Sequence, residues 1–231
     1  MTAAVCGVLG LLVGTLLLPG LVARLPDRVV AEGEPPPVPY RSVVSDAWVR
    51  PVLALATAGV WAVLGAARSG RPDLPAFLAL GAFGVALALV DLRTRRLPDL
   101  LTGPALAAGA VLLLAAAVAD GGWGAYGRAW VGAVLLFGGY LLLAVVRPSD
   151  MGLGDVKLAA PLGLHLAWLG WGQLVLGAFL GFLVGGVAGL VLIALRRVTR
   201  RSSLPFGPSM LVGALLAVVW GEPVVDAYLG R

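Results

Sequence analysis

The sequence predicts an all-α fold, a polytopic membrane helical bundle with about eight transmembrane helices. Of the 231 residues, 60% are hydrophobic and 13% are charged, and the mean hydropathy is +0.97. Soluble domains carry about 25% charged residues, and disordered chains are poor in apolar ones. The composition therefore excludes a soluble globular enzyme and an intrinsically disordered protein. The apolar residues also gather in runs of about the 20 residues that a spanning helix needs.

Eight apolar runs account for the predicted helices. They lie near residues 3–23, 49–67, 75–91, 100–119, 126–146, 156–170, 172–195 and 205–221. The sixth run is the shortest and contains Pro161, and Gly170 lies in the predicted turn after it, so residues 156–196 are expected as either two spans or one. No Lys or Arg precedes Arg24, so we expect the first run to remain a span rather than act as a cleaved signal peptide.

Two further local patterns have structural interpretations. The longest loop, about residues 24–48, includes the segment EGEPPP at 32–37 and is expected to be an extended connector. Glycines recur every fourth residue at Gly177, Gly181, Gly185 and Gly189, a spacing that favours close helix packing.

The distribution of basic residues predicts how the chain crosses the membrane. With eight spans, one side holds only Arg68, Arg71, Arg128 and Arg231 of the 17 Lys and Arg residues, and the other side holds the rest. Because Lys and Arg collect in cytoplasmic loops, both termini are expected outside and the basic loops inside. The net charge of +5 and the pI near 10.1 therefore reflect topology, and we expect no nucleic-acid partner.

Cysteine and histidine are too few for a metal or disulfide site. The chain has one Cys, Cys6, and one His, His165. A single Cys excludes an intramolecular disulfide and a zinc site of paired cysteines. We expect no metal and no cofactor, and we expect His165 to serve packing or an interhelical hydrogen bond.

Four of the 12 acidic residues lie close to predicted span ends: Asp91, Asp99, Asp150 and Asp155. The other eight, Asp73 among them, are expected as solvated loop or tail acids. Asp91 directly follows the third apolar run, Asp99 is expected to cap the fourth, and Asp155 opens the sixth behind Gly152 and Gly154. Two spans separate Asp91 from Asp155, so both must face the same side of the membrane.

Two carboxylates on one side could share a proton. Like charges a few ångströms apart do not ionise together easily, so the pair can act as general base and general acid, as in an aspartic protease. Spacing alone leaves open ordinary helix caps, loop acids and a proton-coupled transport path.

Three segments carry a resemblance to a known family. Residues 91–99 (DLRTRRLPD), 152–157 (GLGDVK) and 204–208 (LPFGP) occur in this order, each beside an apolar run. Together they resemble the type IV prepilin (leader) peptidases, a family of Gly-x-Gly-Asp membrane aspartyl proteases, over roughly residues 75–221.

The resemblance implies a function and a site. Asp91 and Asp155 would be the catalytic pair, Gly152 and Gly154 would shape the loop before Asp155, and Lys157, Pro98 and Pro205 would support the motifs. The implied reaction removes the short basic leader from prepilins or pilin-like proteins, in type IV pilus formation or protein secretion, at the cytoplasmic face of the plasma (inner) membrane. The implied partners are the prepilin substrate and membrane lipid.

The N-terminal part departs from the family. Many members carry paired cysteines in the first cytoplasmic loop, and Ala54 stands where the matching segment usually has Glu. The sequence therefore predicts a peptidase core at 75–231 and a shortened region at 1–74 without the paired-Cys motif, and N-methyltransferase activity is the less favoured expectation. Lys157 is expected to pair with Asp155 or a neighbouring acid, or to anchor the interface. A carboxylate-dependent transporter and a non-catalytic scaffold are the alternatives.

Overall fold

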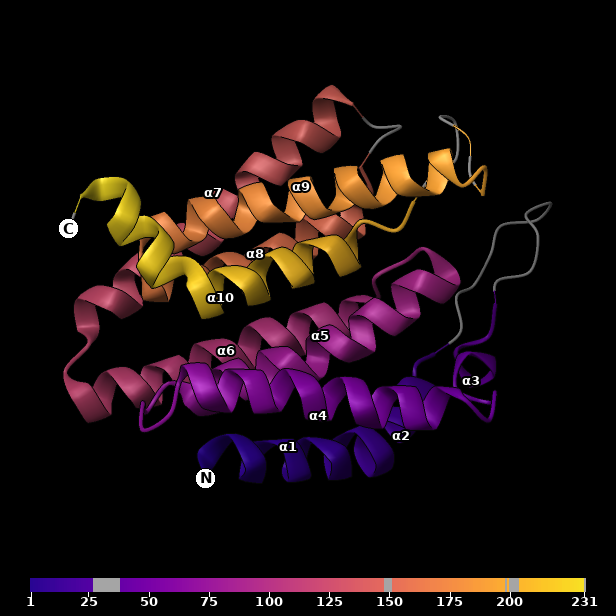
Figure 1. The fold of residues 1–231 in the computed structure, drawn as a ribbon, viewed down its shortest axis with the longest axis horizontal. Coiled ribbons are helices and arrows are strands. Elements are labelled where there is room, and N and C mark those ends of the chain that lie inside the picture. The colour runs from indigo at the N-terminus through magenta and orange to yellow at the C-terminus, as the bar shows by residue number, and fades with distance from the viewer. Residues whose placement is uncertain (27–37, 148–150, 198, 200–203, 231) are drawn as a thin grey trace.

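The computed structural model describes residues 1–26, 38–147, 151–197, 199 and 204–230 (Figure 1). Each of the eight predicted runs is helical. The described helices are α1 (Thr2–Leu12), a π-helical turn (Val13–Leu17), α2 (Leu18–Ala23), α3 (Tyr40–Val43), α4 (Val49–Ala67), α5 (Leu74–Thr94), α6 (Asp99–Asp120), α7 (Trp123–Val146), α8 (Leu153–Leu169), α9 (Trp171–Ala194) and α10 (Gly207–Leu229).

Successive long helices run in opposite directions, so the bundle has two distinct ends (Figure 1). Both termini lie at the left-hand end, which we call the terminal end. The right-hand end, where α4, α6, α8 and α10 begin, we call the basic end, because most of the described Lys and Arg residues lie at the helix ends and connections there. The described ends of the chain therefore share one end of the bundle, as an even number of alternating long helical segments requires.

Within the described residues, seven helical segments are long and apolar enough to cross a membrane, counting Thr2–Ala23 as one. The eighth, α8, has 17 residues and falls short of that length. It ends at Leu169, and α9 begins after Gly170, so the sixth and seventh runs are two helices and not one. The extended connector expected at 32–37 lies outside the described residues, and α3 is the short helix that follows it.

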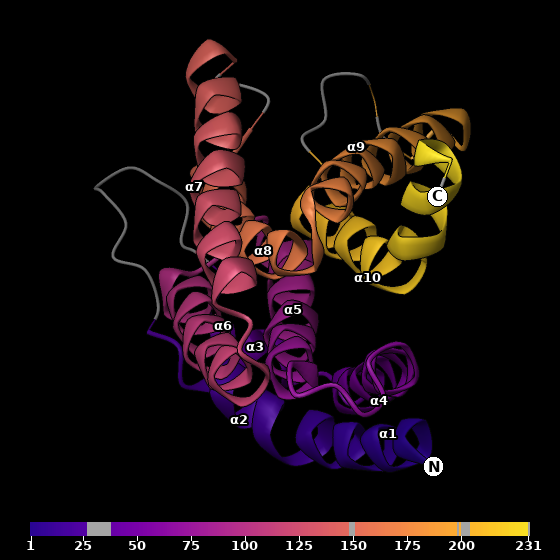
Figure 2. The same ribbon diagram turned by 90° about the vertical axis from the view of Figure 1, so that its left-hand side faces the viewer.

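Helix α8 is the most buried helix of the described bundle, with α5 beside it (Figure 2). Leu158 and Leu164 are fully buried in its apolar sides. Its approach to α7 is close enough that a Cβ on Gly163 would lie 2.5 Å from the carbonyl oxygen of Gly132. A helix enclosed in this way can hold a polar residue at its end in a defined position, because its neighbours leave it little freedom.

The glycine spacing on α9 packs helices, as predicted. Cβ atoms on Gly177 and Gly181 would lie 2.6 Å from Leu166 and 3.3 Å from Met210, and the next two glycines face Phe206 and Leu204. This glycine face therefore brings α9 against α8 and α10.

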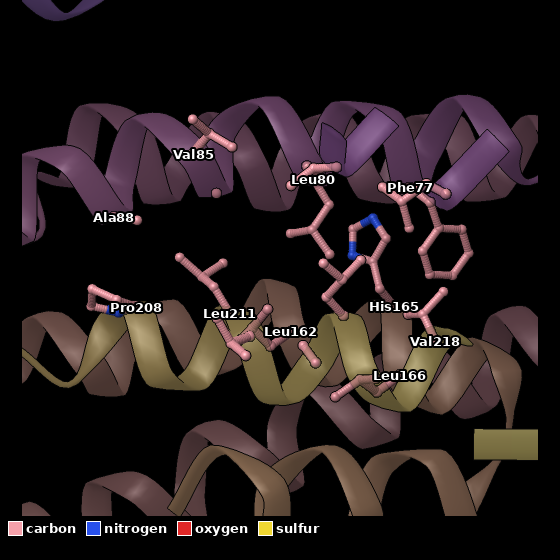
Figure 3. A pocket seen from close by; sticks show the side chains of 17 residues that line it. Phe77, Leu80, Val85, Ala88, Leu162, His165, Leu166, Pro208, Leu211 and Val218 are labelled. Atoms are coloured by element: carbon pink, nitrogen blue, oxygen red, sulfur yellow. The ribbon is translucent and has the colours of Figure 1, made fainter. Parts of the chain in front are cut away.

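An apolar cavity of about 170 Å³ lies between α5 and α10 (Figure 3). Its lining includes Phe77 and His165 toward one end and Ala88 and Pro208 toward the other. The walls come from α4, α5, α8 and α10 and are almost entirely aliphatic.

Candidate active site

A pocket of about 590 Å³ opens at the basic end and contains both Asp91 and Asp155. Its walls come from the end of α5, the α5–α6 loop, the start of α8 and the N-terminal segment. The lining residues that the sequence singled out are Asp91, Pro98, Asp99, Gly152, Gly154, Asp155 and Lys157. The prediction that Asp91 and Asp155 face the same side agrees with this arrangement. Asp150 lies outside the described residues.

Asp91 lies in the last turn of α5 and is 4% exposed. Its Oδ2 accepts a hydrogen bond from the backbone N–H of Gly207, at 3.1 Å. Arg95, at φ 53°, ends the helix one turn later, and its N–H donates to the carbonyl of Asp91 at 2.7 Å. The carboxylate is thus held at a helix end, buried and facing the start of α10.

Asp155 is the third residue of α8, outside the seven candidate spans, and is partly buried. Its Oδ2 accepts the N–H of Gly152 at 3.3 Å, as an acid three residues after the N-cap commonly does. Burial, and then the nearby charge of Asp91, raises the pKa of Asp155 to about 6, against the opposing hydrogen bond from Gly152. Two interacting carboxyl groups of this kind can hold one proton between them near neutral pH.

Asp99 and Lys157 form an ion pair at the rim of the same pocket. The Lys157 ammonium donates to both carboxylate oxygens of Asp99, at 2.7 and 2.8 Å. Asp99 is the first residue of α6, and Pro98 is the N-cap, so the expected capping role of Asp99 is wrong by one position. Of the partners considered for Lys157, the neighbouring acid is the one that the structure contains.

Leu97 and Gly207 are the site residues that sequence reasoning missed. A Cβ on Gly154 would lie 2.9 Å from the Cβ of Leu97, and a Cβ on Gly207 would lie 3.3 Å from its Cδ1. Leu97 therefore packs between the starts of α8 and α10. Pro205 lies just before α10 and does not line the pocket. The segment LPFGP indicated that α10 starts here, but no sequence signal places Gly207 against Asp91.

His165 has a packing role, as expected. It is fully buried on α8, and its Nδ1 and Nε2 lie 2.8 Å from the carbonyl of Pro161 and 3.2 Å from that of Ala76. Its ring meets Phe77 edge to face and lines the apolar cavity instead of the pocket with the acids (Figure 3).

Asp73 corrects an expectation. Instead of a solvated loop acid, it is 4% exposed, paired with Arg68 and hydrogen-bonded to the Trp168 indole N–H at 2.8 Å. In the described part of the chain, no three His, Cys, Asp or Glu side chains gather in a group that could hold a metal ion.

Comparison with known proteins gives a family match for this region. The type IV leader peptidase family model matches residues 78–190. A prepilin leader peptidase/N-methyltransferase of Aeromonas salmonicida (strain A449) is 37% identical over 153 residues, covering 63% of this chain and 49% of the relative. Proteins of the same name from Stutzerimonas stutzeri and Legionella pneumophila are 34% and 33% identical over similar lengths.

The chain thus spans about half the length of these relatives. No solved structure matches it. The matched range includes Asp91, the pocket loops and Asp155, together with the membrane helices between them. Residues 78–190 therefore match the type IV leader peptidase family, which is the resemblance that the three sequence motifs predicted.

Proposed function

We propose that this chain is a membrane aspartic endopeptidase that removes the short basic leader from prepilin or pilin-like precursors. The observation that carries the proposal is the pocket shared by Asp91 and Asp155, in which burial, and then the charge of Asp91, raises the pKa of Asp155. Both acids lie in the region that matches the leader peptidase family.

The two acids would divide the chemistry of peptide hydrolysis. Asp155, whose pKa is raised to about 6, holds the shared proton and donates it toward the peptide carbonyl oxygen. Asp91 accepts a proton from the attacking water while the oxygen of that water bonds to the carbonyl carbon. As the C–N bond of the tetrahedral intermediate breaks, the leaving nitrogen takes the proton from Asp91, and one hydroxyl group of the intermediate returns a proton to Asp155. No covalent enzyme intermediate and no cofactor enters this scheme.

The basic loops support a cytoplasmic site. Arg95, Arg96 and Lys157 line the pocket that holds both acids. Since Lys and Arg collect on the cytoplasmic side of a membrane, the pocket would open at the cytoplasmic face of the inner membrane. Residues 75–231 would form the peptidase core and residues 1–74 an N-terminal accessory region. N-methylation stays the less favoured activity.

The test is cleavage of a prepilin in membranes that contain the wild-type chain, Asp91→Asn, Asp155→Asn or Asp99→Asn. Asp99 is the matched control, because its carboxylate lines the same pocket but is paired with Lys157. The expected result is cleavage by the wild type and by Asp99→Asn, and none by the other two variants.

Two results would contradict the proposal. Cleavage by Asp91→Asn or Asp155→Asn would remove the paired-acid mechanism. Absence of cleavage by the wild type across several pilin-like substrates would favour a non-catalytic scaffold, and proton-driven uptake into vesicles would favour a transporter.

A further inference from the structure

We propose that Gly207 is a positioning residue for the reaction. Its backbone N–H orients the Asp91 carboxylate, and because it has no side chain, that carboxylate has room to lie against the start of α10. This inference rests on the proposed peptidase function, because it assigns a task at the same site. It concerns the start of α10, which the two acidic motifs do not include.

The first observation is the hydrogen bond itself. The N–H of Gly207 donates to Asp91 Oδ2 at 3.1 Å, across 116 positions of sequence. Gly207 is the first residue of α10, where backbone N–H groups have no partner within the helix. Pro208 follows and has no N–H, so Gly207 is the only donor among the first two residues of this helix. A donor fixed at a helix start favours an ionised carboxylate.

The second observation is steric. A Cβ on Gly207 would lie 2.9 Å from Asp91 Oδ2, closer than side chains pack, and 3.3 Å from Leu97 Cδ1. The Asp91 carboxylate is the free end of a side chain and can rotate away, so an added methyl group would displace it at little cost to the fold. The position therefore affects the geometry of the acid pair more than the stability of the bundle.

The third observation is that the start of α10 is itself held in place. The ring of Phe206, the N-cap, lies 5.2 Å from that of Phe182 on α9 and 6.4 Å from that of Tyr140 on α7. A Cβ on Gly185 would lie 2.8 Å from the Phe206 ring, so α9 has no side chain where that ring packs. Because this aromatic cluster anchors Phe206, the N–H that follows it has a defined direction.

The consequence for the reaction is a division of labour between the acids. Asp155 takes its hydrogen bond from its own helix, whereas Asp91 takes one from a different helix. Asp91 is thus held as the ionised partner only when α10 is seated against α5. With the Asp91 carboxylate misplaced, the pocket would still bind substrate, but the carboxylate would align the attacking water poorly.

The experiment measures kcat and KM for prepilin cleavage by Gly207→Ala in membranes. Displacement of a reacting group by about 1 Å can cost about 10²-fold, so we expect kcat to fall by about that factor while KM stays within about twofold. The matched control is Gly221→Ala on the same helix, where a Cβ would lie 2.9 Å from Gln173 Cγ, far from the acids. It should keep the wild-type kcat.

A double variant separates positioning from crowding. Leu97→Ala removes the atoms that lie 3.3 and 3.4 Å from the added Cβ but leaves the contact with Asp91. If Gly207 acts through Asp91, Gly207→Ala/Leu97→Ala has no higher kcat than Gly207→Ala, with Leu97→Ala assayed alongside. Recovery of kcat in the double variant would mean that the methyl group only crowds Leu97, and would overturn the proposal.

The remaining outcomes also decide. If Gly207→Ala does not accumulate, Phe206→Leu replaces it: loosening the helix start should lower kcat without changing KM, and an unchanged kcat would overturn the proposal. A fully active Gly207→Ala alongside an inactive Asp91→Asn would reject this inference alone. An inactive wild type or an active Asp91→Asn would reject the proposed function instead.

Discussion

Helix α5 has a buried aspartate at each end, and the two differ in their partners. Asp73, directly before the helix, and Asp91, in its last turn, are each 4% exposed. Asp73 receives the Arg68 guanidinium and the Trp168 indole N–H. Asp91 receives the Gly207 N–H and, within the described residues, makes no ion pair. The two carboxylates are thus equally buried, but the one at the terminal end is paired with a cation and the one at the basic end is not.

The comparison teaches that burial alone does not mark an acid for chemistry. A buried carboxylate paired with a cation is fully engaged, and removing its partner leaves an uncompensated charge. A buried carboxylate beside a second acid and a backbone donor keeps an oxygen available to water. The predictions below test whether this difference separates stability from activity along one helix.

The largest expected effect is a separation of activity between the two acids of α5. Asp91→Asn should lower prepilin cleavage by about 10³-fold or more, because general acid–base groups contribute about 10²–10⁴-fold. Its thermal unfolding in detergent should match that of the wild type or improve. Asp73→Asn should cleave normally per folded molecule, and equal loss in both variants would contradict the comparison.

The next effect is on stability at the terminal end. Arg68→Met leaves Asp73 buried without its cation, which should cost about 3–5 kcal/mol of unfolding free energy. Cleavage by the fraction that remains folded should be unchanged, since this pair lies far from the pocket. The measurement compares the unfolding free energies of Arg68→Met and of the control Arg71→Met in the same detergent. Equal stability of the two variants would show that the Arg68–Asp73 pair is not structural.

The pH dependence sharpens the picture of the basic end. Asp155, with its pKa raised to about 6, keeps its proton below that pH and loses it above. If the reaction needs this proton, kcat/KM falls as pH rises through the pKa, approaching a tenfold loss per pH unit. A rate that is flat from pH 5 to 8.5 would argue against a shared proton.

The same titration has a direct control. Asp91→Asn removes the charge that helps to raise the pKa of Asp155, so Asp155 should lose its proton at a lower pH. Carbodiimide labels protonated carboxyl groups, and mass spectrometry of the Asp155 peptide against pH would follow this shift. Because the folded state raises the pKa of Asp155, the wild type should lose stability as pH rises from 4 to 7. Asp155→Asn lacks this titration, so its stability relative to the wild type should increase over the same range.

The smallest expected effect concerns the ion pair at the pocket rim. The side chains of Lys157 and Asp99 are 46% and 70% exposed, and pairs of this kind contribute about 0.2–1 kcal/mol. Lys157→Met should therefore lower the unfolding free energy by less than about 1 kcal/mol, and less still at high salt. A loss of unfolding free energy as large as that of Arg68→Met would mean that the ion pairs at the two ends of the bundle stabilise the fold equally.

The sequence singled out Asp91 and Asp155, which line one pocket, but it did not predict the contacts around them. The number of spans between Asp91 and Asp155 predicted that both face the same side of the membrane, since an even number returns the chain to that side, and the family resemblance suggested the pair. The fate of Asp73 could not be predicted, because its loop position resembles that of any solvated acid. Its burial depends on Trp168, 95 positions away in the chain.

Long-range contacts explain the other differences. Asp99 and Lys157 meet across 58 positions, and Gly207 meets Asp91 across 116. Local rules for helix starts placed Asp99 within one residue of the correct cap, but they do not say which distant group a side chain or an N–H contacts.

The sequence by itself determined the all-helical membrane fold, the order of the apolar helices and the expectation that Asp91 and Asp155 share one side of the membrane. These follow from local composition and from the length of a helix that crosses a bilayer. Only the tertiary structure decided that Asp73 is buried in an ion pair with Arg68, that Lys157 binds Asp99 and that Gly207 faces Asp91. Each of these depends on which helices pack together and at what separation, and that is set by small-residue contacts such as those of Gly154 and Gly207 with Leu97.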